Sequence, residues 1–224
     1  MQIAIDGPAA SGKSTAARLL AGKLGFLYID TGAMYRAVTL MGIRRGIDFD
    51  DPEAIIGIAR QARIQLLPDN SGERGFKVLL NEEDVTRDIF TPPVDALVSI
   101  TARIPAVRKI LAEAQRQMAS ENNVVMAGRD IGSNVLPGAS LKIFLVADLL
   151  ERARRRQGEM AINGQDESLE AIAENLRFRD ATDSQREDSP LIKTPDAFLV
   201  DSSHLSIEEM VDLMEKEARR RMNP

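Results

Sequence analysis

The sequence predicts an α/β fold in which helices flank a five-stranded parallel sheet. Three observations lead to this prediction. Short, almost wholly apolar runs alternate with helical patterns along the 224 residues, as is typical of strands that are buried on both faces of a parallel sheet. A turn of small residues joins the first apolar run directly to the first helical pattern. Two apolar runs around a polar turn interrupt the series once, which predicts a small inserted hairpin.

The strands are predicted from the apolar runs, and the helices from their periodicity and their ends. TAARLLAGKLG, residues 15–25, predicts a helix that ends at Gly25. Pro105 begins another helix, with apolar residues at the helical period. Ser206 and Glu209 have the spacing of a capping box at the start of the last helix. The five strand candidates are Ile3–Asp6, Phe26–Asp30, Val124–Ala127, Leu141–Ala147 and Ala197–Asp201.

The inserted hairpin is predicted between residues 63 and 81. RIQLL and FKVLL are its two strand patterns, and the segment PDNSGERG between them is rich in residues that favour turns. We therefore expect a β-containing insertion in the α/β scaffold.

The composition predicts a soluble, cytoplasmic globular protein. Hydrophobic residues make up 44% and charged residues 28%, and there is no cysteine for a disulfide framework or a thiolate metal site. No apolar run approaches the ~20 residues of a membrane helix, and the N-terminus lacks the basic and apolar pattern of a signal peptide. The net charge of −5 argues against a general nucleic-acid surface. We therefore expect neither a membrane nor a nucleic acid as a partner.

Residues 7–15, GPAASGKST, have the spacing G-x-x-x-x-G-K-[ST] of a phosphate-binding loop, or P-loop. Glycines let the backbone curl so that N–H groups point at an anion, and the following helix presents its positive end to the same place. In this motif Lys13 reaches the β- and γ-phosphates and the Ser14 hydroxyl ligates Mg²⁺. The alternative is an ordinary strand–turn–helix with incidental glycines. The predicted ATP-binding residues are Gly7, Pro8, Ala9, Ala10, Ser11, Gly12, Lys13, Ser14 and Thr15.

Other sequence features narrow the class of P-loop protein. A GTPase reads guanine with Asn-Lys-x-Asp, and that string is absent from the sequence. A motor or large ATPase usually carries more chain beyond the nucleotide core. A kinase for a small acceptor needs a second anionic site that faces the first, and the distribution of arginines is the observation that bears on it.

The stretch from Glu167 to Glu187 carries an apolar stripe that becomes ionic without changing its register. Leu169, Ile172, Ala173 and Leu176 form the apolar part, and Arg179, Asp180, Asp183 and Arg186 continue it. Charged residues are rarely buried unless they are paired or hold a ligand. The stripe therefore favours a ligand site, the alternative being a helix that leaves the core and is solvated at its end.

A second group of arginines precedes that stretch. Arg152, Arg155 and Arg156 lie at i, i+3 and i+4 on one side of a predicted helix, and the alternative interpretation is a solvated basic face. GEMAINGQDES, residues 158–168, is polar and predicts a hinge or loop tip. Two arginine-bearing helices joined by a soft turn are typical of a movable cover, which we call the lid.

Two further candidate sites follow strands, where open α/β sheets bind ligands. Thr31 and Arg36 lie in DTGAMYR after the second strand, and Arg129 and Asp130 lie in GRDIG after the third. Each segment could alternatively be a plain loop. Together with the P-loop they indicate phosphate binding on both sides of a cleft.

The segments IDGPAASGKST, DTGAMYRA, AGRDIG and RDATDSQR together resemble the bacterial cytidylate kinases, over essentially the whole chain. The resemblance implies an enzyme that phosphorylates CMP and dCMP from ATP with Mg²⁺. It also implies a usually monomeric P-loop kinase fold. The implied organisation is a core of residues 1–37, 97–150 and 180–224, an inserted CMP-binding region at 38–96 with the hairpin, and a helical lid at 151–179.

The resemblance also implies roles for single residues. Lys13, Arg129 and Arg186 match catalytic positions. Thr31, Arg36, Arg129 and Arg186 match residues that bind the acceptor, mainly around its phosphate; Ser99, Arg108 and Asp130 match cytosine contacts; and Arg179 and Asp183 match positions near the pentose. The family often has Ser where Thr31 stands, and Thr keeps the hydroxyl. His204, the one histidine, is expected to have no functional role.

Two other functions remain open on the sequence. One is another small-acceptor P-loop kinase, and the other is a regulatory switch that binds ATP and hydrolyses it slowly. A switch shares the P-loop but does not need a second arginine-lined pocket.

Overall fold

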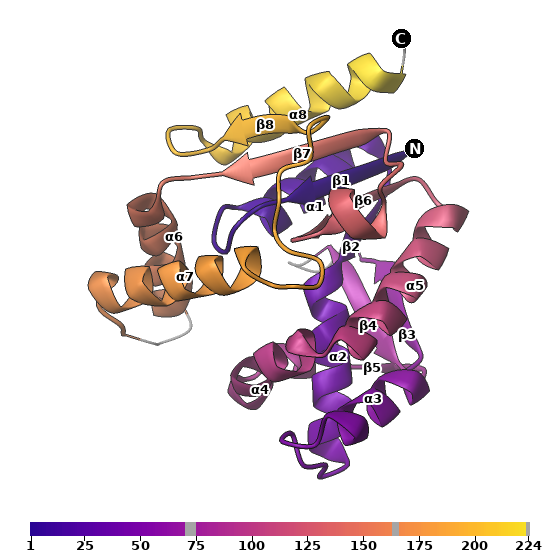
Figure 1. The fold of residues 1–224 in the computed structure, drawn as a ribbon. Coiled ribbons are helices and arrows are strands. Elements are labelled where there is room, and N and C mark those ends of the chain that lie inside the picture. Colours follow the sequence, from indigo (N-terminus) through magenta and orange to yellow (C-terminus); the bar gives the residue numbers. More distant parts are fainter. Residues whose placement is uncertain (70–74, 163–165, 223–224) are drawn as a thin grey trace. The chain divides into compact units, whose positions relative to one another are not determined.

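The computed structural model describes residues 1–69, 75–162 and 166–222 (Figure 1). The chain divides into two compact units: unit 1 comprises Met1–Phe26 and the chain from Val125 onward, and unit 2 comprises Leu27–Val124. The strands are β1 (Gln2–Asp6), β2 (Leu27–Asp30), β3 (Ile64–Pro68), β4 (Phe76–Leu80), β5 (Glu83–Asp84), β6 (Val124–Gly128), β7 (Leu141–Val146) and β8 (Phe198–Asp201). The α-helices are α1 (Lys13–Leu24), α2 (Thr31–Arg44), α3 (Pro52–Gln61), α4 (Pro92–Arg103), α5 (Pro105–Glu121), α6 (Leu149–Ile162), α7 (Leu169–Ser184) and α8 (Ile207–Met222).

The larger sheet has five strands in the order β2-β6-β1-β7-β8, which confirms the predicted α/β fold class. Parallel pairing sets Ile3 of β1 opposite Leu141 of β7, and Ile143 of β7 opposite Phe198 of β8. Each strand begins and ends within one residue of its predicted bounds. β1 is buried from Ile3 to Asp6, as an apolar strand inside a parallel sheet must be.

The helix ends of unit 1 follow the signals in the sequence. Gly25 adopts a left-handed conformation with φ 67° and closes α1, where its N–H donates to the last carbonyls of the helix. At α8, the Ser206 hydroxyl accepts from the Glu209 N–H, and the Glu209 carboxylate accepts from the Ser206 N–H. The predicted capping box is confirmed. α1 and α8 pack against one another.

The two helices of the predicted lid, α6 and α7, pack on each other in unit 1 (Figure 1). Their buried apolar cluster consists of Ala9, Ala153, Ile172, Ala173 and Leu176. The prediction of a soft turn from Gly158 was wrong as far as Ile162, because α6 continues through these residues and Met160 packs against the cluster. Residues 163–165 of the predicted turn lie outside the described residues.

Unit 2 is built around α2, which contacts α3, α4 and β4. β3 and β4 pair antiparallel and confirm the predicted hairpin strands, and β5 adds a third strand that was not predicted. Residues 70–74 of the hairpin turn lie outside the described residues. A buried hydrogen bond of 2.9 Å between the hydroxyls of Thr39 and Thr101 joins α2 to α4.

The described helices are all too short or too polar to span a membrane.

Candidate active site

The P-loop, residues 7–15, connects β1 to α1. Gly7 has φ 155°, and a Cβ at this position would lie 2.0 Å from the Leu145 carbonyl oxygen, so the close passage of the loop against β7 requires glycine. Gly12 has φ 90°, which also favours glycine. Ser14 is exposed and Thr15 half-buried at the start of α1. The motif therefore occupies the strand–turn–helix setting that phosphate binding needs.

Lys13 lies folded back across the P-loop and is buried, with 6% of its surface exposed. Its Nζ donates to the Pro8 carbonyl at 2.5 Å and lies 3.4 Å from the Ser11 hydroxyl. Burial lowers the pKa of Lys13 well below its ordinary range; the charge of Arg129 lowers it further, and Asp6 and Asp183 oppose this. Lys13 thus shares one electrostatic environment with residues far away in the sequence.

Two lid arginines donate to carbonyls of the P-loop. Arg152 Nη1 lies 3.2 Å from the Ala9 oxygen, and Arg155 Nη1 lies 3.4 Å from the Ser11 oxygen. Arg152 is buried and also forms an ion pair of 2.7 Å with Asp180 of α7. The alternative of a solvated basic face is therefore wrong for Arg152. Arg156 pairs instead with Glu159 at 3.0 Å on the helix surface.

Asp183 holds two arginines that the sequence predicted for the acceptor site. Its carboxylate accepts from Arg129 Nε at 2.8 Å and from Arg186 Nη2. Asp183 lies on α7 in register with the buried apolar residues, and only 9% of its side chain is exposed. The sequence left open that this helix leaves the core and is solvated at its end. The burial of Asp183 shows that this alternative is wrong at this position. Arg179, one turn earlier, is exposed, and its charge still acts on Lys13.

Asp130 follows β6 and is buried beside a π-helical turn, Ile131–Val135, which was not predicted. The Asn134 side-chain amide donates to the Asp130 carboxylate at 3.0 Å and to the Ser189 hydroxyl at 3.0 Å. Asn134 therefore fixes the orientation of a carboxylate that the resemblance assigns to base recognition.

Asp6 ends β1 immediately before the P-loop, and its carboxylate accepts two backbone N–H groups. The donors are Ile131 at 2.8 Å and Gly132 at 2.7 Å. Burial raises the pKa of Asp6 to about 6, and the two hydrogen bonds oppose that rise. A Cβ on Gly132 would lie 3.3 Å from an Asp6 carboxylate oxygen, so glycine suits this close approach. Asp6 thereby ties the P-loop strand to the segment that carries Arg129 and Asp130.

Unit 2 contains the other predicted acceptor residues. Thr31 is buried at the first position of α2, directly after Asp30, whose carboxylate caps the helix. Arg36 on α2 forms an ion pair of 2.6 Å with Asp95 and lies 5.0 Å from the centre of the Phe90 ring. Arg108 is buried on α5, whereas Ser99 is exposed on α4.

Within unit 1, the structure therefore joins Arg129, Asp183 and Arg186 by direct contacts, and the charges of Arg129 and Asp183 act on Lys13. Sequence reasoning missed Asp6, Asn134 and Ser202, the last of which is a buried serine after β8. The sequence did offer a signal for Asp6, because it is a charged residue at the end of an apolar strand. It offered no such signal for Asn134 or Ser202. His204 is exposed in the loop before α8.

Among residues 1–69, 75–162 and 166–222, no group of three or more His, Asp or Glu side chains is arranged to hold a metal ion. Mg²⁺ in phosphoryl-transfer sites is bound largely by phosphate oxygens and water, with few protein ligands. The exposed Ser14 hydroxyl at the N-terminus of α1 fits that mode of binding.

Comparisons with known sequences identify one family. The family profile described as Cytidylate kinase matches residues 3–220. A cytidylate kinase of Carboxydothermus hydrogenoformans is 49% identical over 211 residues, which cover 94% of this chain and 94% of that protein. A cytidylate kinase of Desulforamulus reducens is 51% identical over 210 residues, which cover 94% of this chain and 93% of that protein. A solved structure, TT1252 from Thermus thermophilus, is similar in fold, with a TM-score of 0.50 and 18% identity over 100% of this chain and 98% of that one.

Proposed function

The chain belongs to the cytidylate kinase family, and on that premise we propose that it transfers the γ-phosphate of ATP to CMP or dCMP. The products are ADP and CDP or dCDP. The observation that carries the proposal is the cluster in which the buried Asp183 holds the half-buried Arg129 and Arg186. The charges of Arg129 and Asp183 also act on Lys13 of the P-loop. A protein that binds only ATP does not need this second cluster of arginines in addition to Lys13.

On the donor side, the P-loop residues bind the phosphates of ATP. Lys13 leaves the Pro8 carbonyl and contacts the β- and γ-phosphates, where its charge stabilises the transition state. The Ser14 hydroxyl would hold Mg²⁺, which when bound screens the negative charge of the donor phosphates.

On the acceptor side, Arg36, Arg129 and Arg186 bind the phosphate of CMP, and Thr31 assists through its hydroxyl. Arg179 and Asp183 contact the pentose, and Ser99, Arg108 and Asp130 recognise cytosine. The family resemblance supports these assignments residue by residue. The contact of Asp183 with Arg129 and Arg186 supports the assignment of these two arginines physically, because it fixes two guanidinium groups at one place.

The chemistry needs positioning more than a specialised base. A phosphate monoester has a second pKa of ~6, so the acceptor oxygen is already ionised near neutral pH. In-line transfer then depends on holding donor and acceptor together and on neutralising charge. The lid, residues 151–179, closes over the phosphates and excludes water, on a core of residues 1–37, 97–150 and 180–224 with an inserted region at 38–96. The protein works as a cytoplasmic monomer.

An ADP-release assay with ATP, Mg²⁺ and a panel of nucleoside monophosphates tests the proposal. CMP and dCMP should stimulate ADP release strongly, whereas release that is independent of any acceptor would favour the regulatory switch. A different preferred acceptor would favour another small-acceptor kinase. Arg129→Ala should raise the KM for CMP, and Arg154→Ala is the matched control, because that arginine is 64% exposed on the lid surface.

A further inference from the structure

Ser202, directly after β8, is a fully buried serine at a junction of three segments. It is 0% exposed. Its N–H donates to the Val146 carbonyl at 2.8 Å. Its hydroxyl oxygen lies 3.1 Å from that same carbonyl and 3.2 Å from the Ser11 carbonyl of the P-loop. The hydroxyl has one proton, so the two carbonyls share it.

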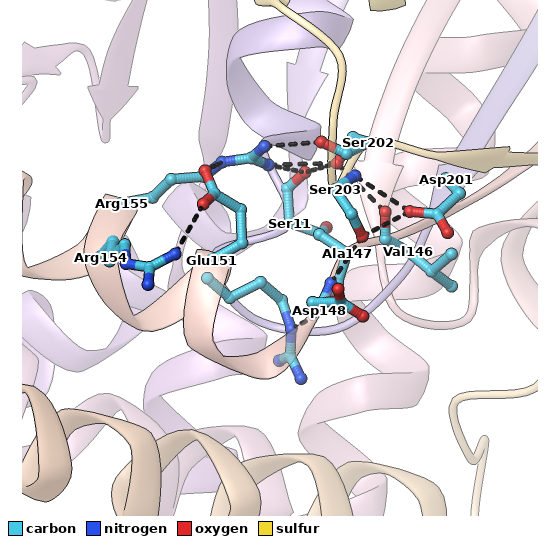
Figure 2. A network of polar contacts seen from close by, with 11 residues as sticks. Ser11, Val146, Ala147, Asp148, Glu151, Arg154, Arg155, Asp201, Ser202 and Ser203 are labelled. Atoms are coloured by element: carbon cyan, nitrogen blue, oxygen red, sulfur yellow. Dashed lines mark hydrogen bonds and ion pairs between the residues drawn. The ribbon is translucent and has the colours of Figure 1, made fainter.

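The lid arginine Arg155 reaches into this junction and is held from two sides (Figure 2). Its Nη1 donates to the Ser202 hydroxyl at 3.1 Å, and its Nη2 donates to the Ser202 carbonyl at 2.7 Å. Its Nε donates to Glu151 at 3.2 Å from the opposite side. A planar guanidinium that donates two hydrogen bonds to one residue and a third to another has a fixed orientation.

This orientation places the Arg155 charge beside the P-loop. Nη1 also lies 3.4 Å from the Ser11 carbonyl, and a Cβ on Gly12 would lie 3.8 Å from Nη1. In a P-loop the residues around the second glycine surround the donor phosphates. The fixed guanidinium therefore lies against the loop that binds the donor phosphates in the proposed function.

We propose that Ser202 is a positioning residue for phosphoryl transfer: it sets the orientation of Arg155 and of the Ser11 carbonyl, so that the Arg155 guanidinium acts on the donor phosphates. This inference rests on the proposed function. Ser202 acts through Arg155 and touches no substrate itself. Removing the hydroxyl leaves one of the two Ser202 contacts to the guanidinium, and a misplaced charge loses its effect in a preorganised site.

Ser203 provides a matched control in the same loop (Figure 2). Its hydroxyl donates to Asp201 at 2.6 Å and accepts from the Asp148 N–H at 2.9 Å. This hydroxyl contacts Asp201 and Asp148, so Ser203→Ala removes polar contacts from the same loop without disturbing the Arg155 arrangement.

The test is a double-mutant cycle with ATP and CMP. The wild type, Ser202→Ala, Arg155→Gln and the double variant are compared for kcat and for the KM of each substrate, with Ser203→Ala as control. Ser202→Ala should lower kcat about tenfold with little change in the KM for CMP, and Ser203→Ala should leave kcat within about twofold. In the Arg155→Gln background, Ser202→Ala should change kcat by less than about twofold, because the group through which it acts is gone.

The inference is overturned if Ser202→Ala has a normal kcat, or if it lowers kcat equally in the wild-type and Arg155→Gln backgrounds. In either case, CMP-dependent ADP release by the wild type still supports the proposed function. A wild type without CMP-dependent release overturns both. If Ser202→Ala does not fold, Arg155→Lys decides, since lysine keeps the charge and loses the two-point contact with Ser202. A kcat of Arg155→Lys near that of the wild type would then contradict the inference.

Discussion

At the scale of single residues, the carboxylate of Asp6 links the P-loop strand to the segment that carries Arg129 and Asp130. It accepts the N–H groups of Ile131 and Gly132 while only 5% of the residue is exposed. Its pKa is raised from an ordinary 3.8 to about 6, so the folded protein favours the protonated form. The contribution to stability is thus fully present below pH 3.8 and is lost as the pH rises through about 6.

We predict that Asp6→Asn removes this dependence. A pKa change from 3.8 to about 6 corresponds to about 3 kcal/mol. The free energy of unfolding of the variant, relative to wild type, should therefore rise by up to that amount between pH 4 and pH 7. Asparagine lacks the second carboxylate oxygen, and this lost acceptor should lower the free energy of unfolding by the same amount at every pH. Urea unfolding of both proteins across this range measures the difference, and parallel curves would refute the role of burial.

We predict that Lys13→Ala lowers turnover by orders of magnitude and leaves the fold intact. The lysine lies on the P-loop with its Nζ on the Pro8 carbonyl, so its loss removes charge stabilisation of the transition state and leaves the apolar core complete. Steady-state kinetics together with circular dichroism provide the check. A folded variant with near-normal turnover would show that Lys13 has been given the wrong role.

Sequence reasoning identified residues whose signals are local. The P-loop could be predicted because its residues are consecutive, and Asp183 because it lies in register with Ile172 and Leu176 on one helix. Ser202 could not be predicted, because its contact with Ser11 joins residues 191 positions apart. Asn134 was missed for a similar reason, since the π-helical turn that carries it has no strong sequence signature.

At the scale of elements, the lid depends on the packing of α6 against α7. Leu176 is 2% exposed in their shared apolar cluster, whereas Leu150 on α6 is 53% exposed. We predict that Leu176→Ala destabilises this pair of helices by about 2–5 kcal/mol, and that Leu150→Ala changes stability by no more than about 0.5 kcal/mol. Hydrogen exchange of α6 and α7 measures both. Equal exchange in the two variants would mean that this cluster does not hold the lid helices together.

The observed helices and strands agree closely with those predicted from the sequence, except where tertiary packing outweighed local composition. Apolar runs fixed the five strands to within one residue, because burial on both faces leaves few alternatives. The polar composition of residues 158–162 favoured a turn, yet Met160 finds an apolar partner and the helix continues. The short strand β5 has no apolar pattern and forms by pairing with β4.

At the scale of the whole molecule, we propose that Arg108 and Asp130 choose the base. Cytosine offers an acceptor at N3 and an amino donor at N4, and uracil reverses both. Arginine can only donate and an ionised aspartate can only accept. Each residue is buried in its own unit: Arg108 is 6% exposed in unit 2, and Asp130 is 8% exposed in unit 1. A buried polar site can reject the wrong analogue by up to ~10⁴-fold, because its groups are left unpaired.

We therefore predict that Asp130→Asn lowers the ratio of kcat/KM for CMP to that for UMP, since an amide can donate to O4 of uracil. Arg108→Ala should depress activity on CMP more than on UMP. For each variant, kcat/KM is measured with CMP and with UMP at saturating ATP. The activity on UMP is the internal reference for the activity on CMP. A change below about twofold in both variants, roughly 0.4 kcal/mol, would place base recognition elsewhere.

The fate of the γ-phosphate tests the central claim most directly. Phosphorus-31 NMR can follow wild-type protein with ATP, Mg²⁺ and CMP until the ATP signal stops falling. Transfer predicts that each ADP is accompanied by one CDP, with inorganic phosphate at background, because in the proposed function the arginines hold an acceptor in line and the lid excludes water. Inorganic phosphate formed in step with ADP, with CMP unchanged, would contradict the account.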